Sequence, residues 1–145
     1  MSEGAKMTLS VLLVDDNPHF LRVLDRFLAA DGDGEVRVVG SVVGGRDAGA
    51  QAARLHPDVI LVDLKMPDVP GLQLLPELRT MLPDAILIAL TLMEPDECRE
   101  DALAAGADAF VSKASLEYDL LPTIQRLAAG APRYTAAPDP EPRRP

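Results

Sequence analysis

The sequence predicts an α/β fold, in which a doubly wound, five-stranded parallel sheet carries five helices on its two faces. Short apolar runs alternate with segments of helical periodicity, five times each along the chain. The runs are apolar at nearly every position, which is typical of parallel strands covered by helices on both sides. The helical segments between them supply the crossover connections that parallel strands require.

The individual elements are predicted from the length and punctuation of these segments. Asn17 followed by Pro18 is typical of a helix N-cap and first helical position, and this first helix ends before the Gly- and Asp-rich turn at 31–34. We expect strands at about 9–14, 36–43, 58–62, 85–90 and 109–111, and the next three helices at about 46–55, 71–82 and 95–105.

The last helix contains a proline that would break a regular helix interior. Pro122 lacks an N–H group and would clash with the preceding turn if the helix began near Leu116. We therefore expect the regular helix to begin near Asp119, so that Pro122 lies in a first turn whose N–H groups are unpaired in any case. A longer, kinked helix is the alternative.

Length and composition favour one acidic domain. The 145 residues suit a single domain, which we expect over 9–130, between a flexible N-terminus (1–8) and a Pro-rich tail (131–145) that is disordered or the stub of a linker. The net charge of −9 argues against nucleic-acid binding, and the single Cys98 excludes an intrachain disulfide or a Cys-based zinc site. No apolar run is long enough to span a membrane, so we expect a soluble, cytoplasmic protein.

Three carboxylates stand at the ends of two predicted strands. Asp15 and Asp16 directly follow the first strand, and Asp63 directly follows the third. These strands are neighbours in the flavodoxin-like order 2-1-3-4-5, and the carboxyl ends of parallel strands open onto one crevice. Carboxylates gathered in one place repel one another unless a cation neutralises them. Oxygen ligands with room for water suit Mg²⁺, so the sequence predicts a magnesium site at this edge.

Two residues at neighbouring strand ends suit a phosphoryl group. Thr91 closes the fourth strand and Lys113 follows the fifth, so a hydroxyl and an ammonium join the same crevice. They would supply a hydrogen-bond donor and a counter-charge to phosphoryl oxygens. Because a carboxylate can act as a nucleophile and form an aspartyl phosphate, the combination predicts phosphoryl transfer onto an aspartate.

These motifs make the chain similar to the receiver domains of two-component response regulators, from about Leu9 to Gly130. The shared residues are, in order, Val14-Asp15-Asp16, then Asp63-Leu64-Lys65-Met66-Pro67 with Gly71, then Thr91, then Lys113. No single motif is diagnostic, but the complete set at the correct strand ends is highly specific. The resemblance implies that Asp63 accepts a phosphoryl group from a phosphohistidine of a sensor histidine kinase.

The resemblance also implies roles for the surrounding residues. The implied ligands of Mg²⁺ (or Mn²⁺) are Asp15, Asp16, Asp63 and the Lys65 backbone carbonyl, and the implied ligands of the phosphoryl oxygens are Thr91 and Lys113. Phe110 matches an aromatic switch residue whose rotamer follows the threonine in this family. Their coupling would reshape the face made by the fourth helix, fifth strand and fifth helix. That face would bind a downstream protein, an output domain or a second copy of the chain.

Two positions near the phosphate site depart from the family's usual residues, and two others are expected to affect its reaction rates. Leu92 stands where the family usually has a small residue, and we expect it to restrict access to the nucleophile. Lys65 and Met93 occupy positions expected to control the dephosphorylation rate. Ala114 stands where proline usually follows the phosphate-binding lysine, a change common in receivers linked to helix-turn-helix output domains.

The leading prediction is a phosphorylation-operated switch rather than an enzyme, because the chain would catalyse only its own phosphorylation and dephosphorylation. One alternative is the receiver half of a DNA-binding transcription regulator whose output domain is absent. The other is a receiver-like interaction module that Leu92 leaves unphosphorylated.

Overall fold

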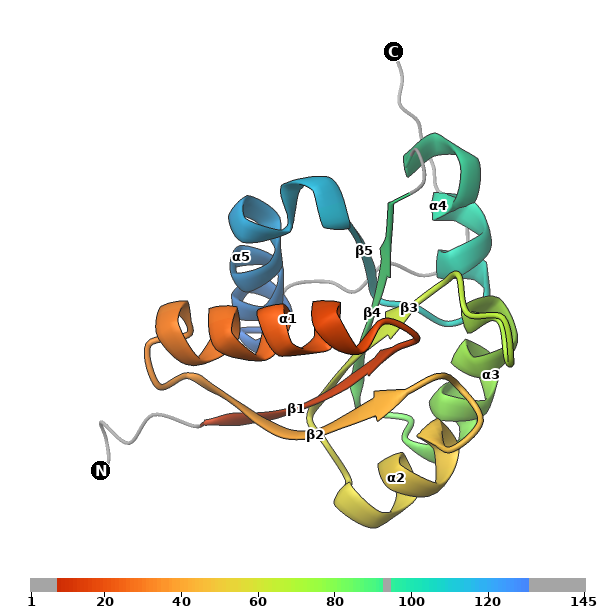
Figure 1. Cartoon of the computed structure of the whole chain (residues 1–145), viewed down its shortest axis with the longest axis horizontal. Helices are drawn as coiled ribbons and strands as arrows, with labels where there is room; N and C mark the ends of the chain where they lie inside the picture. The colour runs from red at the N-terminus through yellow and green to blue at the C-terminus, as the bar shows by residue number, and fades with distance from the viewer. Residues whose placement is uncertain (1–7, 93–94, 131–145) are drawn as a thin grey trace.

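The computed structural model, which describes residues 8–92 and 95–130, confirms the predicted fold class. Five parallel strands form one sheet in the order β2-β1-β3-β4-β5. In chain order the elements are β1 (Leu9–Asp15), α1 (Pro18–Asp31), β2 (Val36–Val43), α2 (Ala48–Leu55), β3 (Val59–Asp63), α3 (Gly71–Met81), β4 (Ile86–Thr91), α4 (Pro95–Ala104), β5 (Ala109–Ser112), the 3₁₀-helix η1 (Lys113–Ser115) and α5 (Leu116–Ala128). Helices α1 and α5 lie on one side of the sheet and α2, α3 and α4 on the other (Figure 1).

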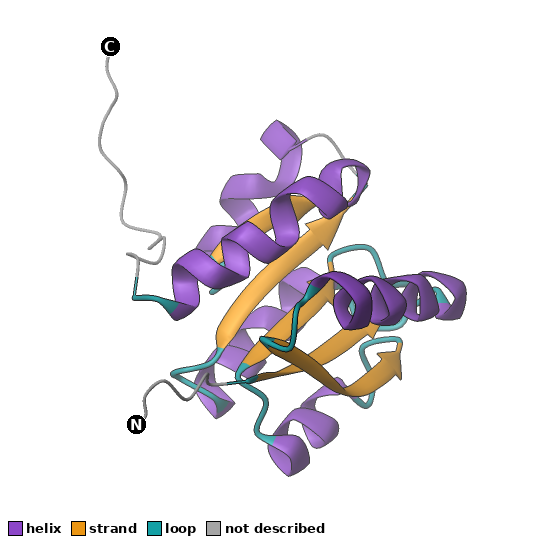
Figure 2. Ribbon diagram, turned by 90° about the vertical axis from the view of Figure 1, so that its left-hand side faces the viewer, coloured by secondary structure: helices purple, strands orange, loops and turns teal. Residues whose placement is uncertain are grey.

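Each face of the sheet contributes to its own aliphatic core. One cluster joins sheet residues such as Leu12 and Leu87 to α2, α3 and α4, and the other joins Leu13 and Ile88 to α1 and α5. Successive residues of a strand point to opposite faces, so a strand that feeds both cores must be apolar throughout. β3 and β4 are buried along their whole length, as expected of inner strands lying between two helical layers (Figure 2).

The strand ends bring the polar residues of interest to one edge. Asp15, Asp63 and Thr91 are the last residues of β1, β3 and β4, and Lys113 follows β5 directly. β3 pairs with both β1 and β4, so the ends of three neighbouring strands are adjacent. The polar side chains therefore gather at the carboxyl edge, where the topology predicts a ligand site.

The predicted start of the last helix is wrong. α5 begins at Leu116, directly after η1, and Pro122 lies inside it rather than in its first turn. The missing N–H group costs one bond to the carbonyl of Tyr118, a residue whose side chain is 74% exposed, so water can reach this side of the helix. The apolar stripe that α5 packs against the sheet, which includes Leu116, Leu120 and Ile124, outweighs that loss.

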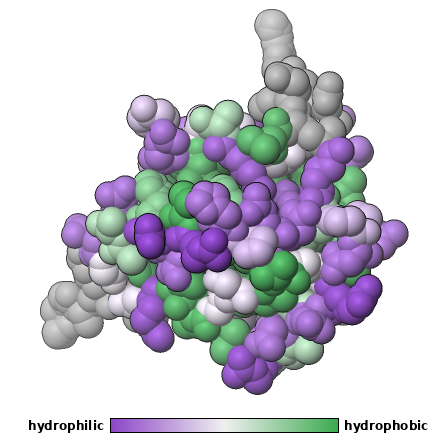
Figure 3. All heavy atoms as spheres, in the orientation of Figure 1, coloured by the Kyte–Doolittle hydropathy of each residue, from purple (hydrophilic) through white to green (hydrophobic). Residues whose placement is uncertain are grey.

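Polar groups cover most of the face seen in Figure 3, where apolar side chains form separate patches. Among the large apolar side chains of the described residues, Leu92 is 77% exposed at the carboxyl edge and Tyr118 is 74% exposed on α5. No helix within residues 8–92 and 95–130 combines the length and the apolar character that crossing a bilayer requires.

Candidate functional site

A cavity of about 350 Å³ opens at the carboxyl edge of the sheet. It is lined by Asp15, Asp16, Asn17, Asp63, Lys65, Thr91, Leu92 and Lys113. A larger hollow of about 540 Å³ lies at the opposite edge, around the beginnings of β1, β3 and β4. Volume alone would select the larger one, but ligands of doubly wound folds bind at the carboxyl ends of the strands. The smaller cavity also holds the clustered charges.

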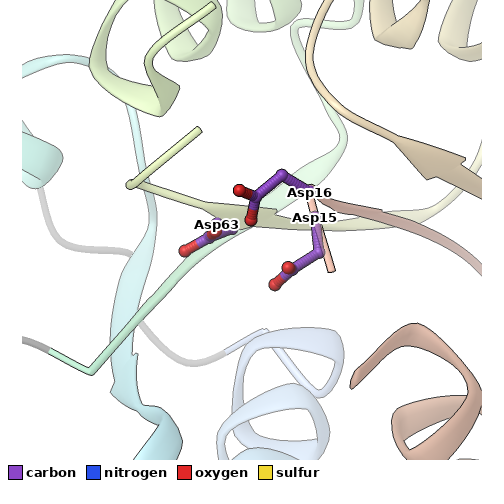
Figure 4. Close-up of side chains that lie close together, drawn as sticks. All are labelled: Asp15, Asp16 and Asp63. Carbon is purple, nitrogen blue, oxygen red and sulfur yellow. The ribbon is translucent and has the colours of Figure 1, made fainter. Parts of the chain in front are cut away.

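Three carboxylates converge in this cavity. Asp15, Asp16 and Asp63 each place one oxygen within 4.8 Å of the other two (Figure 4). Asp15 and Asp63 are buried, whereas Asp16 is exposed. The Asp15 carboxylate is oriented by the backbone N–H of Asn17, which donates to Oδ1 over 2.9 Å. The cluster therefore has a fixed, buried part and one carboxylate that is open to solvent.

Lys113 places its ammonium beside the two buried carboxylates. Its Nζ lies 2.6 Å from Asp15 Oδ2 and 3.5 Å from Asp63 Oδ1. Only 11% of its side chain is exposed. The hydroxyl of Ser112 caps the 3₁₀-turn that begins at Lys113, accepting a hydrogen bond from Ala114 N, and so fixes the backbone from which the lysine extends. Lys113 acts as an internal counter-ion of the cluster.

The carboxyl of Asp63 is hard to ionise in this setting. Burial and the neighbouring Asp15 carboxylate raise the pKa of Asp63 from 3.8 to about 6, although Lys113 and the N–H of Lys65 act in the opposite direction. The Lys65 N–H donates to Asp63 Oδ1 over 3.3 Å. A bound cation would relieve the part of this rise that comes from the Asp15 carboxylate.

A family model of the response regulator receiver domain matches residues 11–125. The chain belongs to this family. It is similar to the response regulator VraR of Staphylococcus aureus, with 32% identity over 124 residues, which cover 86% of this chain and 58% of VraR. The chain therefore spans 58% of the length of that curated relative.

Solved structures of receiver domains are also similar to this chain. The signal receiver domain of NarL from Mycobacterium tuberculosis matches with a TM-score of 0.76 and 27% identity, covering 86% of this chain and 98% of that one. A BeF3-activated receiver domain of DrrB matches with a TM-score of 0.73 and 25% identity, covering 85% of this chain and 99% of that one. DrrB is a Thermotoga maritima protein.

The donor set of this receiver domain fits the divalent cation that its family implies. Carboxylate oxygens are hard ligands, and Mg²⁺ is usually bound by one or two carboxylates together with water and phosphate oxygens. Asp16, which is exposed, leaves room for water. The residues present therefore fit a divalent cation, which Asp15, Asp16 and Asp63 could hold.

Two other predicted site residues, Leu92 and Phe110, do not belong to the acidic cluster. Leu92 lines the cavity with a side chain that is 77% exposed, so it stands at the rim rather than across the floor. Phe110 lies in β5, half-buried, and packs against the core under α4. Met93 lies outside the described residues.

Removing the charge of Asp63 is expected to stabilise the metal-free domain. A raised pKa means that the native state disfavours the carboxylate, so stability is lost as the pH rises from about 4 to about 6. Asp63→Asn should therefore raise the free energy of unfolding by about 2 kcal/mol near neutral pH, a value discounted from the full shift for solvent screening. Urea unfolding of both proteins in the presence of a metal chelator measures this difference in the free energy of unfolding.

Most of the gain should be gone near pH 4, because the wild-type carboxyl is then protonated in the native state and only about half ionised in the unfolded state. Asp25→Asn, at an exposed position of α1, is the matched control and should give no gain. A gain in Asp63→Asn that is equal at both pH values would contradict the assigned cause.

A further aspartate, Asp68, connects the loops beside the cavity and was not among the predicted site residues. The carboxylate of Asp68 accepts hydrogen bonds from the N–H groups of Gly45 (3.1 Å), Arg46 (3.1 Å) and Val69 (2.7 Å). These N–H groups, led by that of Gly45, hold the pKa of Asp68 below its usual value. Asp68 thereby ties the loop after β2 to the loop after β3, which carries Lys65.

Two glycines let the loops approach each other this closely. Gly44 has a φ of +88°, and a Cβ there would lie 2.7 Å from Asp68 Oδ2. A Cβ on Gly45 would lie 2.9 Å from Val69 Cβ. The contact therefore depends on glycine at both positions.

Loss of this tether is expected to weaken the metal site. Asp68→Ala should lower the Mg²⁺ affinity by about threefold to tenfold, because the loop that carries the Lys65 carbonyl loses three hydrogen bonds. Asp47→Ala is the matched control, since Asp47 lies in the same loop after β2 and its side chain makes no capping hydrogen bond. Calorimetric titration of both variants measures the effect, and equal affinities would refute it.

Proposed function

We propose that this receiver domain accepts a phosphoryl group on Asp63 in a Mg²⁺-dependent reaction and acts as a switch in two-component signalling. The observation that carries the proposal is the cavity itself, where Lys113 Nζ lies within 3.5 Å of an Asp63 oxygen and two further carboxylates converge. The phosphoryl donor is a phosphohistidine of a sensor histidine kinase in the cytoplasm. As a receiver domain, the chain is not an enzyme in the usual sense, because the phosphoryl group that it takes up becomes attached to the chain.

In the proposed reaction an Asp63 oxygen attacks the phosphorus atom, the new O–P bond forms as the N–P bond breaks, and the histidine leaves with the bonding electrons. Lys113 Nζ and the Thr91 hydroxyl hold the transferred oxygens. When bound, Mg²⁺ supplies positive charge to the carboxylates and to the phosphoryl group. The Lys65 backbone carbonyl is proposed as its remaining protein ligand.

The switch is proposed to run from the threonine to the α4-β5-α5 face. When Thr91 turns towards the phosphoryl oxygens, Phe110 takes up the space that it leaves, and the packing of this face changes. Phe110 is half-buried against the core under α4, so a change of its rotamer bears on that helix. The changed face binds a downstream protein, an output domain or a second copy of the chain.

Leu92, Lys65 and Met93 are proposed to set the lifetime of the phosphorylated state. Leu92 and Lys65 line the cavity, and both are exposed. The bulky side chain of Leu92 restricts access to Asp63, whereas the charged side chain of Lys65 affects the approach of the hydrolytic water. Met93 belongs to this set by its place in the sequence.

Binding of a phosphoryl analogue tests the proposed function. Beryllofluoride, with which the related DrrB receiver was activated, should bind the wild-type domain with one-to-one stoichiometry when Mg²⁺ is present. In chelator the calorimetric signal should disappear. If Mg²⁺ binds but beryllofluoride does not, the domain is a receiver-like interaction module that is not phosphorylated.

A second candidate function is favoured by the length of the relatives. VraR extends well beyond the region that this chain matches, since the match covers 58% of it. In this second proposal the chain is the receiver part of a longer, DNA-binding regulator, and Asp63 controls that regulator. DNA binding by the longer protein, increased by beryllofluoride and Mg²⁺, would support it.

A further inference from the structure

The ammonium of Lys113 has a third neighbour besides the two buried carboxylates. Its Nζ lies 4.2 Å from the centre of the Phe20 ring, within the range of a cation–π interaction. The side chain of Lys113 is only 11% exposed, so water does little to screen this contact. An aromatic ring presents negative potential on its face and attracts a cation there without carrying a charge itself.

The fold fixes Phe20 for this contact. Asn17 caps α1, and its side-chain oxygen accepts hydrogen bonds from the N–H groups of His19 (3.0 Å) and Phe20 (3.2 Å). The ring also packs against the core under α1 and α5. Lys113 lines the cavity, whereas Phe20 is not among the described residues that line it. The ring therefore contacts the ammonium without occupying space that a phosphoryl group needs.

We propose that Phe20 is a positioning residue for Lys113, which keeps the ammonium directed at the phosphoryl site when Asp15 is occupied by the metal ion. This inference rests on the proposed function. Lys113 Nζ lies 2.6 Å from Asp15 Oδ2, yet a carboxylate that binds Mg²⁺ is a weaker partner for a lysine. The neutral ring remains as a partner, and it adds no charge to a cluster that already repels itself.

A carboxylate in place of the ring would raise that repulsion, and an aliphatic side chain would fill the space without attracting the cation. The distinctive property is therefore the charge distribution of the ring rather than its volume. Plain core packing is the competing account of Phe20, and it depends on volume alone.

Fluorinated phenylalanines at position 20 separate these two accounts. Successive fluorination of the ring weakens the negative potential of its face while changing its volume little. We expect the rate of phosphorylation by acetyl phosphate, at saturating Mg²⁺, to fall stepwise across mono-, di- and trifluorophenylalanine, by about tenfold in total. Phe20→Tyr should retain most of the rate, whereas Phe20→Leu should lose as much as the trifluorinated ring or more.

A second readout needs neither metal nor activity. In the metal-free wild type the ring should shift the NMR signals of the Lys113 methylene protons next to Nζ upfield, and Phe20→Leu should abolish that shift while Phe20→Tyr keeps it. Urea unfolding midpoints that stay constant across the fluorinated series exclude a loss of packing as the cause of the slower rate.

The outcomes separate this inference from the proposed function. If the wild type is active and its rate does not change with fluorination, or if the upfield shift is absent, the positioning role is overturned and the proposed function stands. If the wild type is not phosphorylated at all, the proposed function is overturned, and this inference with it.

Discussion

Replacing Lys113 with methionine is expected to slow phosphorylation by acetyl phosphate by about 100-fold or more at saturating Mg²⁺. The ammonium lies beside Asp15 and Asp63 in a buried position, where a fixed positive charge is worth more than in water. Methionine keeps the length of the side chain but leaves the charge on the transferred oxygens unmatched. Intact-mass kinetics with acetyl phosphate measures the rate.

The affinity for Mg²⁺ should behave differently. Lys113 Nζ lies 2.6 Å from Asp15 Oδ2, so it would compete with a metal ion for that carboxylate. Lys113→Met should therefore bind Mg²⁺ at least as tightly as the wild type, although its phosphorylation is much slower.

Lys65→Met is the matched control for this variant. Both lysines line the cavity, but Lys65 is exposed and Lys113 is buried beside the carboxylates. We expect a change of less than about threefold in the phosphorylation rate of Lys65→Met. A Lys113→Met protein that is phosphorylated as fast as Lys65→Met would remove the lysine from the proposed mechanism.

Replacing either member of the acidic pair is expected to weaken Mg²⁺ binding strongly. Asp15→Asn should lower the affinity by about 100-fold, because it removes a charged oxygen ligand while an amide oxygen can still accept the hydrogen bond from Asn17 N. Asp16→Asn should have a smaller effect of about tenfold, because Asp16 is exposed and water can replace its oxygen. Calorimetric titration with Mg²⁺ measures both.

Asp25→Asn serves again as the control, since it removes one negative charge from an exposed position of α1 and leaves the cavity intact. Its Mg²⁺ affinity should equal that of the wild type. An equal loss in Asp25→Asn and Asp15→Asn would mean that net charge, rather than coordination, governs the binding.

The sheet was predictable from the sequence because its strands are apolar on both faces. The apolar run of β2 predicted the observed bounds, Val36–Val43. β1 and β5 extend one residue beyond the expected end, and β3 and β4 each begin and end one residue later than expected. The carboxyl ends of neighbouring parallel strands lie at the same edge of the sheet. The strand-end residues Asp15, Asp63 and Thr91 could therefore be placed at one edge from the sequence alone.

The error at α5 has a different origin. The local rule for Pro122 is sound for a helix on its own, but tertiary packing of the apolar stripe from Leu116 to Leu127 supplies more free energy than one absent hydrogen bond costs. Local preference loses to packing at this position, and the sequence alone does not reveal the balance.

Two residues beside the site, Asp68 and Phe20, could not be predicted from the sequence because their partners are distant along the chain. Asp68 binds N–H groups of Gly45 and Arg46, which lie in a different loop, and no periodicity fixes how two loops approach each other. Phe20 is one apolar residue near the start of α1, and no local pattern indicates its contact with Lys113, which follows β5. A Gly-Gly pair at 44–45 was the one available signal of a close approach.

The most direct test is intact-mass spectrometry of the domain after incubation with acetyl phosphate and Mg²⁺. We expect one added phosphoryl group on the wild type, and none on Asp63→Asn or on the wild type in chelator. Asp63→Asn should remain folded, as its expected gain in stability would demonstrate. An adduct that persists in Asp63→Asn, or a wild type that binds Mg²⁺ and gains no phosphoryl group, would contradict the claim that Asp63 is the acceptor.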